Sequence, residues 1–377
     1  MERAILHCDM NNFYASVECK LDESIKNKPV VVAGEVEMRH GVVVAKNYEA
    51  NKYGVKVGDT VWQAKNKCKN LVVISPPHFE EYYKFSKMAK SIYERFTDYI
   101  EPFGLDECWL DVTRSTKLFG SPKEIADKIR ETIKKELGIT ISVGVSFNKI
   151  FAKLGSDMKK PDATTIITKE NFKSLIWPLP ANSLIGVGRS TKKILDKYRI
   201  KTIGDIAKEK KETLFYWLGK SGEMLYKYAN GLDDSEVQNI EYINDIKSAG
   251  HGMTTKNDLV NNDEIWKVIF WLTKEISNKL QYNKKRAKGI AITIKNNLLI
   301  KKQYQRQFNI SKQASIEIAK EAYKLFLEKY DWDYPVRAIT VTAINLINDS
   351  DMEEQSIFEN SEKQNKIEMA ENILKKY

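Results

Sequence analysis

Acidic residues interrupt two apolar, strand-like segments of the chain. Asp9 closes the run that begins at Ala4, and Asp106 and Glu107 open the run that ends at Val112. A carboxylate within an apolar strand is costly to desolvate unless a cation pairs with it. If the two strands lie side by side, the three acids form a cluster of like charge that divalent metal ions relieve, the arrangement of two-metal phosphoryl chemistry. The alternative is that each acid only marks a strand end.

The composition is that of a soluble, folded protein. At 377 residues the chain exceeds one ordinary core, so we expect about two to four domains. Hydrophobic residues make up 42% of the chain and charged residues 30%. No stretch approaches the ~18 to 20 apolar residues of a membrane span, and the first residues do not form a signal peptide. These features predict a cytoplasmic protein without a membrane partner.

The formal charge of +10 is unevenly distributed. Residues 247–349 hold 18 Lys and Arg against 10 Asp and Glu, whereas residues 350–377 hold seven acids and four bases. A basic domain favours a polyanion as partner, although an ordinary lysine-rich surface is the alternative. The four cysteines have unrelated spacings, which favours reduced thiols over zinc ligands or disulfides.

Hydrophobic periodicity divides the chain into regions of different character. Residues 1–165 mix short β-branched strands with helices, and residues 166–232 follow the pattern of short helices. A polar stretch at 233–247 is typical of a linker. Residues 248–348 then alternate long strands with two helices, which predicts an α+β unit with an antiparallel sheet.

Several short motifs suit a nucleotide and a phosphate backbone. Tyr48 and Lys52 share one predicted helix, and Lys160 follows the end of another, where point cations suit triphosphate oxygens. Gly186 and Gly188 form a glycine hairpin that lets backbone N–H groups approach a phosphate without regard to base sequence. The two lysine-bearing segments have a plainer explanation, because charged helix ends are usually only solvated.

With these motifs in order, the chain resembles the Y-family DNA polymerases of the DNA polymerase IV type, from about residue 3 to 348. The resemblance rests on residues 9–18, 47–50, 103–112, 142–149, 152–161 and 184–188. It implies an α+β multidomain fold shaped as a right hand, and a template-directed DNA polymerase of the low-fidelity, lesion-bypass type.

The resemblance also implies domain boundaries. These are a palm at 1–20 and 76–165, fingers at 21–75, a helical thumb with a helix-hairpin-helix at 166–232, a linker at 233–247, a little finger at 248–348, and an acidic tail at 349–377. Within them, Asp9, Asp106 and Glu107 match the ligands of two Mg²⁺ ions, with the backbone carbonyl of Met10 as a further ligand.

The nucleotide-binding residues carry over one by one. Tyr14 matches the steric gate that discriminates against ribose, and Phe13 is the residue beside it. Tyr48 and Lys160 match triphosphate contacts. Two positions depart from the family pattern. Asn51 stands where an arginine is usual, so that either Lys52 supplies the missing cation or dNTP binds more weakly. Asn11 stands at a second acidic position and is not expected to bind metal.

Primer-template DNA and dNTP are the partners that the resemblance implies. In the thumb, Gly186, Gly188 and Arg189 are expected to contact DNA. The candidates in the basic domain are Lys284, Lys285, Arg286, Lys288, Lys301, Lys302 and Arg306. Two other functions stay open at this point: a non-catalytic scaffold that binds DNA and clamp, and a nucleotide cyclase, which needs neither a hairpin thumb nor a basic C-terminal domain.

The acidic tail resembles a sliding-clamp peptide through Gln355, Ile357 and Phe358, although it is one residue short between the Gln and the apolar pair. A disordered acidic tail with stray apolar residues is the alternative. The resemblance further implies a monomer associated with the bacterial nucleoid.

Overall fold

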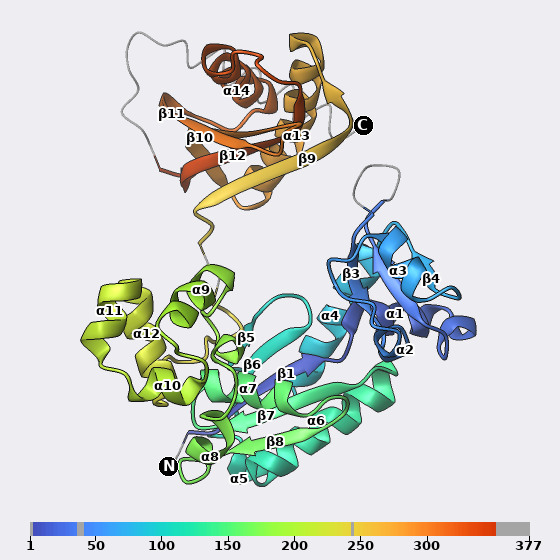
Figure 1. The fold of residues 1–377 in the computed structure, drawn as a ribbon, viewed down its shortest axis with the longest axis vertical. Helices are drawn as coiled ribbons and strands as arrows, with labels where there is room; N and C mark the ends of the chain where they lie inside the picture. The colour runs from blue at the N-terminus through green and yellow to red at the C-terminus, as the bar shows by residue number, and fades with distance from the viewer. Residues whose placement is uncertain (1–2, 36–40, 243–244, 352–377) are drawn as a thin grey trace. The chain divides into compact units, whose positions relative to one another are not determined.

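The computed structural model describes residues 3–35, 41–242 and 245–351, and the chain divides into two compact units. The first comprises residues 1–34 and 42–243, and the second residues 35–41 and 244–377. Both are drawn in Figure 1. Each unit has its own apolar core.

A five-stranded sheet of order β5-β6-β1-β7-β8 forms the centre of the first unit. Its strands are β1 (Ile5–Met10), β5 (Ile100–Pro102), β6 (Glu107–Asp111), β7 (Ile141–Ser146) and β8 (Thr164–Ile167). β1 pairs antiparallel with both β6 and β7, so every residue of β1 is buried. This central strand brings its acid into the interior of the palm.

Helices cover both faces of this sheet. The core that contains Leu6, Cys8 and Leu110 also contains buried residues of α4 (Phe79–Tyr93) and α6 (Pro122–Leu137). α6 begins with a capping box and ends at a glycine with φ of 70°, as expected for an amphipathic surface helix. On the other face, α7 (Lys149–Met158) approaches β7 so closely that a Cβ at Gly144 would lie 1.8 Å from the Ala152 carbonyl oxygen.

The fingers are a smaller sheet of order β3-β2-β4, with strands β2 (Val30–Ala33), β3 (Val43–Lys46) and β4 (Val72–Ile74). Its helices are α2 (Tyr48–Lys52) and α3 (Val61–Lys67), with the short η1 (Glu23–Ile25), and α1 (Phe13–Leu21), whose buried apolar residues belong to the palm core, leads into it. Asn47 caps α2, since its side chain accepts from the Ala50 N–H at 2.9 Å. The cap satisfies one of the free backbone N–H groups at the start of the helix that carries Tyr48.

Short helices form the thumb, as predicted. They are α8 (Phe172–Ile176), η2 (Ala181–Ser183), α9 (Arg189–Lys197), α10 (Ile203–Lys208), α11 (Lys211–Leu218) and α12 (Lys220–Ala229). The remaining short helix, α5 (Thr116–Phe119), belongs to the palm and precedes α6. Beyond α12, Val237 is buried against Ile5, Trp109 and Ala152. The first part of the predicted linker segment is therefore packed on the palm.

The second unit is a four-stranded antiparallel sheet of order β11-β10-β12-β9 with two helices. Its elements are β9 (Ser248–Leu259), α13 (Asn262–Tyr282), β10 (Lys285–Asn296), β11 (Lys301–Lys312), α14 (Ser315–Lys329) and β12 (Val336–Asn348). Ile290, Ile292 and Ile294 alternate toward the helices and form the core with them. This agrees with the α+β pattern expected of this region.

Candidate active site

The predicted acids lie at one end of the palm sheet. Asp9 and Glu107 are directly opposite each other on β1 and β6, so their side chains project from the same face. Asp106 precedes β6, and its carbonyl accepts from the Met10 N–H at 3.0 Å. Two segments far apart in sequence therefore bring all three acids to the end of one pair of strands.

Burial leaves two of these acids poorly stabilised as anions. Asp9 is only 7% exposed. Burial raises its pKa to about 6, with a further rise from the charge of Glu107, although Lys160 opposes the shift. The pKa of Asp106 is also raised, first by burial and then by the neighbouring Glu107. Both carboxylates would gain from an added cation.

Glu107 has the opposite electrostatic balance. Burial alone would raise its pKa, but contacts with His7 and Lys153 hold that pKa at about 2. His7 Nε2 lies 3.1 Å from the Glu107 carboxylate, and His7 Nδ1 lies 2.8 Å from Ser156 Oγ. Lys153 Nζ pairs with the same carboxylate. These partners come from β1 and α7 and lie on the α7 face of the sheet.

Two lysine ammonium groups pair with the acids: Lys153 with Glu107 and Lys160 with Asp9. Lys160 Nζ donates to Asp9 Oδ2 at 2.8 Å and to Asp157 Oδ1 at 2.9 Å. Among the described residues, no three His, Cys, Asp or Glu side chains are arranged as a ready metal cage. The donors are nonetheless all oxygens, as Mg²⁺ requires, and burial raises the pKa of Asp9 and Asp106, so that a bound cation would stabilise both anions. The residues therefore fit divalent metal ions.

Tyr14 stands beside the acids within a group of aromatic rings. Its ring stacks on Tyr82 with centroids 4.4 Å apart, and Phe79 packs against it edge-on at 5.9 Å. The Tyr82 hydroxyl donates to the buried Glu18. Burial raises the pKa of Tyr14, and the charge of Asp106 raises it further, so the ring lies near the acids.

Tyr48 and Lys160 are close to the same acids. Burial raises the pKa of Tyr48, while Lys160 lowers it and Asp9 raises it. One turn further along α2, the Asn51 side-chain oxygen accepts from Lys46 Nζ. The cation at Asn51 is thus Lys46 of β3, to which no sequence motif pointed. Lys52 is exposed.

Sequence reasoning assigned no role to His7, Lys153, Ser156 or Tyr82. A signal for two of them exists, because Lys153 and Ser156 recur with Lys149 at helical spacing and therefore share the face of α7 that packs on β1. No local pattern points to Tyr82, since its hydrogen-bond partner Glu18 and its stacking partner Tyr14 come from α1.

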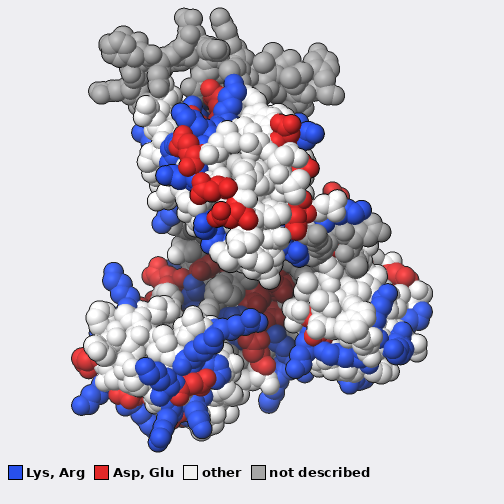
Figure 2. Space-filling view, turned by 45° about the horizontal axis from the view of Figure 1, so that its top comes forward, with Lys and Arg blue, Asp and Glu red and all other residues white. Residues whose placement is uncertain are grey.

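The thumb hairpin has the conformation that its glycines allow. Gly186 has φ of 93°, and a Cβ there would lie 3.0 Å from the Met224 side chain. Gly188 precedes α9 and has open space on its Cβ side. Basic side chains gather on the thumb and fingers of the first unit in Figure 2, around a recess with acidic side chains on its floor.

The basic candidates of the second unit differ in exposure. Lys285 is 5% exposed, and its Nζ donates to Asn348 Oδ1 at 2.6 Å. Arg306 pairs with Glu328 of α14. The two lysines that begin β11 are exposed. A role in DNA contact stays a prediction for each of them, and the buried lysine is the least accessible.

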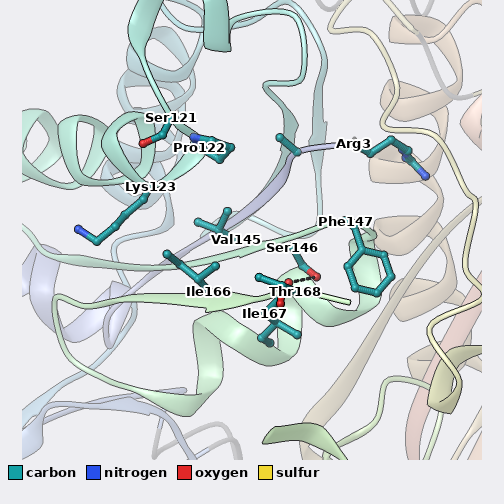
Figure 3. Close-up of a pocket in the computed structure, with 11 residues that line it drawn as sticks. Arg3, Ser121, Pro122, Lys123, Val145, Ser146, Phe147, Ile166, Ile167 and Thr168 are labelled. Atoms are coloured by element: carbon teal, nitrogen blue, oxygen red, sulfur yellow. Dashed lines mark hydrogen bonds between the residues drawn. The ribbon is translucent and has the colours of Figure 1, made fainter. Parts of the chain in front are cut away.

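Other features lie away from the acids or outside the description. A pocket of about 300 Å³ is lined by Arg3, Lys123, Val145 and Ile166 at the β8 edge of the palm sheet (Figure 3), and it contains none of the predicted site residues.

The clamp candidates Gln355, Ile357 and Phe358 lie outside the described residues. In the part of the chain that the structure describes, no helix is long and apolar enough to span a membrane.

Comparisons with known families cover most of the chain. Residues 8–157 match the impB/mucB/samB family, and residues 246–357 match the C-terminal domain of that family. Residues 182–233 match the thumb domain described for DNA polymerase-iota.

Full-length relatives agree with these matches. A DNA polymerase IV of Acetivibrio thermocellus is 48% identical over 99% of this chain and 94% of its own length. DNA polymerase IV 1 of Bacillus subtilis is 35% identical over 100% of this chain and 91% of its own. A solved Y-family DNA polymerase chimera of Dbh and Dpo4 superposes with a TM-score of 0.82 at 25% identity, covering 92% of this chain and 99% of the chimera.

The chain therefore belongs to the impB/mucB/samB family of Y-family DNA polymerases, the translesion enzymes of the DNA polymerase IV type. The predicted fold class and the enzyme class, a DNA-directed DNA polymerase, are confirmed. Primer-template DNA and dNTP are its substrates, and a divalent metal is its cofactor. A cyclase is excluded by the same matches, which include a thumb and the family's C-terminal domain.

Proposed function

We propose that the first unit adds dNTPs to a primer 3′-hydroxyl with Asp9, Asp106 and Glu107 holding two Mg²⁺ ions. The observation that carries this proposal is the register that sets Asp9 opposite Glu107 and puts Asp106 beside them. Met10 ends the same strand, so its carbonyl is available as a further oxygen ligand. The bound ions would make the primer hydroxyl more acidic and neutralise the leaving pyrophosphate.

The cationic side chains around the acids bind and orient the nucleotide. Lys160 is well placed to bind the triphosphate, because its ammonium already lies within bonding distance of Asp9 and close to Tyr48. Burial alone would lower the pKa of Lys160. Its bonds to Asp9 and Asp157 outweigh burial and raise that pKa above the usual value, so the ammonium stays charged. Tyr48 adds a hydroxyl, and Lys52 or Lys46 supplies a second cation in place of arginine at position 51.

Tyr14 acts as the sugar gate in this proposal. Its ring is held by Tyr82 and by Phe13, whose centroids lie 4.4 Å and 5.5 Å away, so it cannot turn aside without disturbing both. A ribose 2′-hydroxyl would meet this fixed ring, whereas a deoxyribose would pack on it. Selectivity then arises from repulsion in a preformed pocket.

DNA binding is divided between the thumb and the second unit. In the thumb, Gly186, Gly188 and Arg189 present backbone N–H groups and one cation at the start of α9. In the second unit, the candidates are Lys284, Arg286, Lys288, Lys301, Lys302 and Arg306, with Lys285 the least exposed. Contacts of this kind predict sequence-independent affinity that falls steeply with salt.

The tail and the cellular setting complete the proposal. Gln355, Ile357 and Phe358 bind a sliding clamp, and the protein works as a cytoplasmic monomer associated with the nucleoid. A pull-down with purified clamp tests the tail, and an unchanged yield for Phe358→Ala would remove that part of the proposal.

Primer extension by Asp106→Ala tests the catalytic assignment. We expect extension to be abolished while affinity for primed DNA is retained, because Asp106 faces the acid cluster and contributes no positive charge for DNA. A non-catalytic scaffold predicts that wild-type protein binds primed DNA without extending it. Extension retained by Asp106→Ala would refute the role given to this carboxylate.

A further inference from the structure

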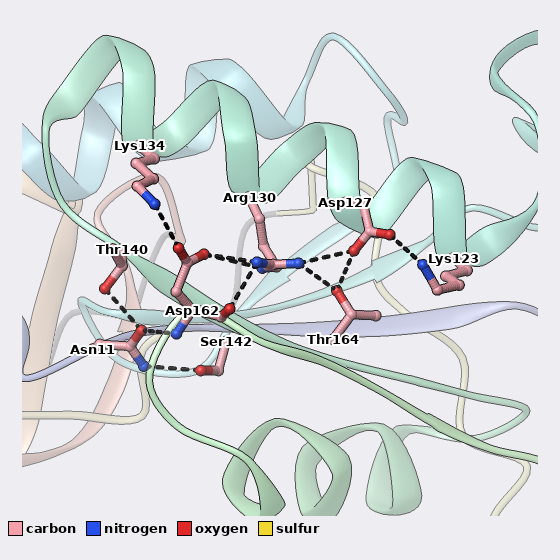
Figure 4. Close-up of polar contacts among 9 residues, drawn as sticks. All are labelled: Asn11, Lys123, Asp127, Arg130, Lys134, Thr140, Ser142, Asp162 and Thr164. Atoms are coloured by element: carbon pink, nitrogen blue, oxygen red, sulfur yellow. Dashed lines mark hydrogen bonds and ion pairs between the residues drawn. The ribbon is translucent and has the colours of Figure 1, made fainter.

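A buried asparagine directly after the active-site strand organises a second polar group in the palm. Asn11 is 2% exposed and makes three side-chain hydrogen bonds (Figure 4). Its Oδ1 accepts from the Asp162 N–H and from Thr140 Oγ1, both at 3.0 Å, and its Nδ2 donates to Ser142 Oγ at 3.0 Å. The amide therefore ties the start of α1 to β7 and to the loop before β8.

Two cationic side chains of α6 also hold the loop before β8, through Asp162. Arg130 donates to Asp162 Oδ1 from Nε at 3.2 Å and from Nη2 at 2.9 Å, and Nη2 also donates to the Asp162 carbonyl at 2.7 Å. Lys134 Nζ reaches the other carboxylate oxygen at 2.8 Å. Arg130 is fixed in turn by Asp127 at 2.9 Å and by Thr164 at 3.2 Å.

This double attachment fixes a backbone conformation that the chain would not hold unaided. Asp162 has φ of 52°, in the left-handed region that is costly for residues with a Cβ and is tolerated best by Asp and Asn. Its N–H, carbonyl and carboxylate all have partners from Asn11 and Arg130. The turn therefore has one well-defined geometry.

Lys160 lies two residues before this fixed point. Its Nζ meets Asp9 at 2.8 Å and Asp157 at 2.9 Å, although a lysine side chain is long and flexible. Where its ammonium can reach depends on the position of its Cα, which the turn at Asp162 sets. Figure 4 shows Asn11, which directly follows β1, and Arg130 of α6 converging on Asp162.

We infer that Asn11, Arg130 and Asp162 form a positioning network that holds Lys160 for the triphosphate of the incoming nucleotide. The inference rests on the proposed function of Lys160. It also gives the residue at position 11 a role of its own: its side chain is occupied by the turn that carries Lys160, not by a metal ion. None of the three side chains touches the substrate.

Steady-state and binding measurements on the full chain test this network. Arg130→Met removes the fork to Asp162 and should raise the KM for dNTP about tenfold, with a smaller change in kcat, because ground-state placement of one phosphate contact is lost. Arg130→Lys keeps the charge but loses the forked guanidinium, so it should raise the KM for dNTP by a smaller factor. This variant provides the measurement if Arg130→Met folds poorly. Arg95→Met is the matched control. Arg95 pairs with Glu136, also on α6, at 2.6 Å, and its loss should leave KM unchanged.

A double-mutant cycle with Lys160→Ala distinguishes positioning from general stability. If Arg130 acts through Lys160, Arg130→Met should add nothing to the KM of Lys160→Ala, and affinity for primed DNA should stay constant throughout. Full multiplicative effects in the double variant, or an unchanged KM in Arg130→Met, would overturn the inference while leaving the polymerase intact. A Lys160→Ala variant with wild-type KM would remove both the role of Lys160 and this network, whereas wild-type protein that extends no primer would refute the proposed function itself.

Discussion

Two clusters of charge flank the end of β1, and they differ in how well their carboxylates are satisfied. In the catalytic cluster, burial raises the pKa of Asp9 to about 6 and also raises that of Asp106. In the network around Arg130, burial opposes ionisation too, but cations and hydrogen bonds lower the pKa of Asp162 and Asp127 below the usual value. The same residue type is thus destabilised at one site and stabilised at the other.

The difference shows which cluster is built for structure and which for chemistry. A structural ion pair completes its own hydrogen bonds, whereas a site that must bind cations keeps anionic oxygens short of positive charge. Lys153 and Lys160 meet part of this deficit at Glu107 and Asp9. Divalent cations bound at the end of β1 would therefore stabilise these carboxylates further.

The largest effect is expected from Asp9→Asn. We expect primer extension to fall by at least about 10³-fold, on the scale seen when a catalytic group is removed. In chelator at pH 7, the same variant should be more stable than wild type by roughly 2–3 kcal/mol, because an anion with a raised pKa is no longer buried. Primer extension and denaturant unfolding measure the two quantities, and a clear loss of stability would contradict the electrostatic contrast.

The pH dependence of unfolding follows with a definite sign. The folded-state pKa of Asp9, about 6, lies above its ordinary value of 3.8, so the folded protein binds the extra proton. Asp9 therefore makes metal-free protein less stable as pH rises from about 4 to about 6. Asp9→Asn should remove that part of the slope.

Tyr14→Ala should give the next largest effect, a loss of selectivity against ribonucleotides of about 100-fold, as expected when a steric clash worth a few kcal/mol is removed. Tyr14→Phe is the matched control and should keep the selectivity, because the ring remains stacked on Tyr82. The ratio of kcat/KM for dNTP and rNTP is the measurement. An unchanged ratio in Tyr14→Ala would make Tyr14 a packing residue only.

Asp162→Asn applies the same chemical change as Asp9→Asn to the satisfied cluster. We expect the opposite sign, a loss of about 1–2 kcal/mol in unfolding free energy at pH 7, because charge-assisted bonds from Arg130 and Lys134 are weakened. The lowered pKa of Asp162 means that wild type loses this contribution as pH falls below about 3.8. Equal stability changes in the two variants would erase the distinction between the clusters.

The smallest effect concerns the cation that replaces arginine beside Tyr48. Lys46→Ala should raise the KM for dNTP about fivefold, the scale of one charge-assisted hydrogen bond, because Lys46 is the cation at Asn51. Lys52→Ala is the matched comparison and should change KM less. A larger rise in KM for Lys52→Ala than for Lys46→Ala would identify Lys52 as the compensating cation.

Much of the fold was predictable because its periodicity is strong. The short helices expected at 166–232, and the two helices and alternating strands of the second unit, occur where the apolar residues recur. The pairing of β1 with β6 is the arrangement that a shared site for the three acids requires, and the structure contains it.

Other features could not be read from the sequence because they depend on contacts between distant segments. Asn11 looked only like a missing acid, and its three partners come from residues 140, 142 and 162. The lysine at Asn51 comes from β3, not from the helix that carries Tyr48. The partial docking of the predicted linker through Val237 likewise needs the palm surface to be known.

A crystal structure with primed DNA, dNTP and Mg²⁺ is the most direct measurement of the catalytic cluster. We expect two metal ions bound by Asp9, Asp106 and Glu107, with the ammonium groups of Lys153 and Lys160 withdrawn from the carboxylates and Lys160 on the triphosphate. Metal ions held elsewhere, with both lysines still paired to Glu107 and Asp9, would contradict the assignment of these carboxylates as the catalytic centre.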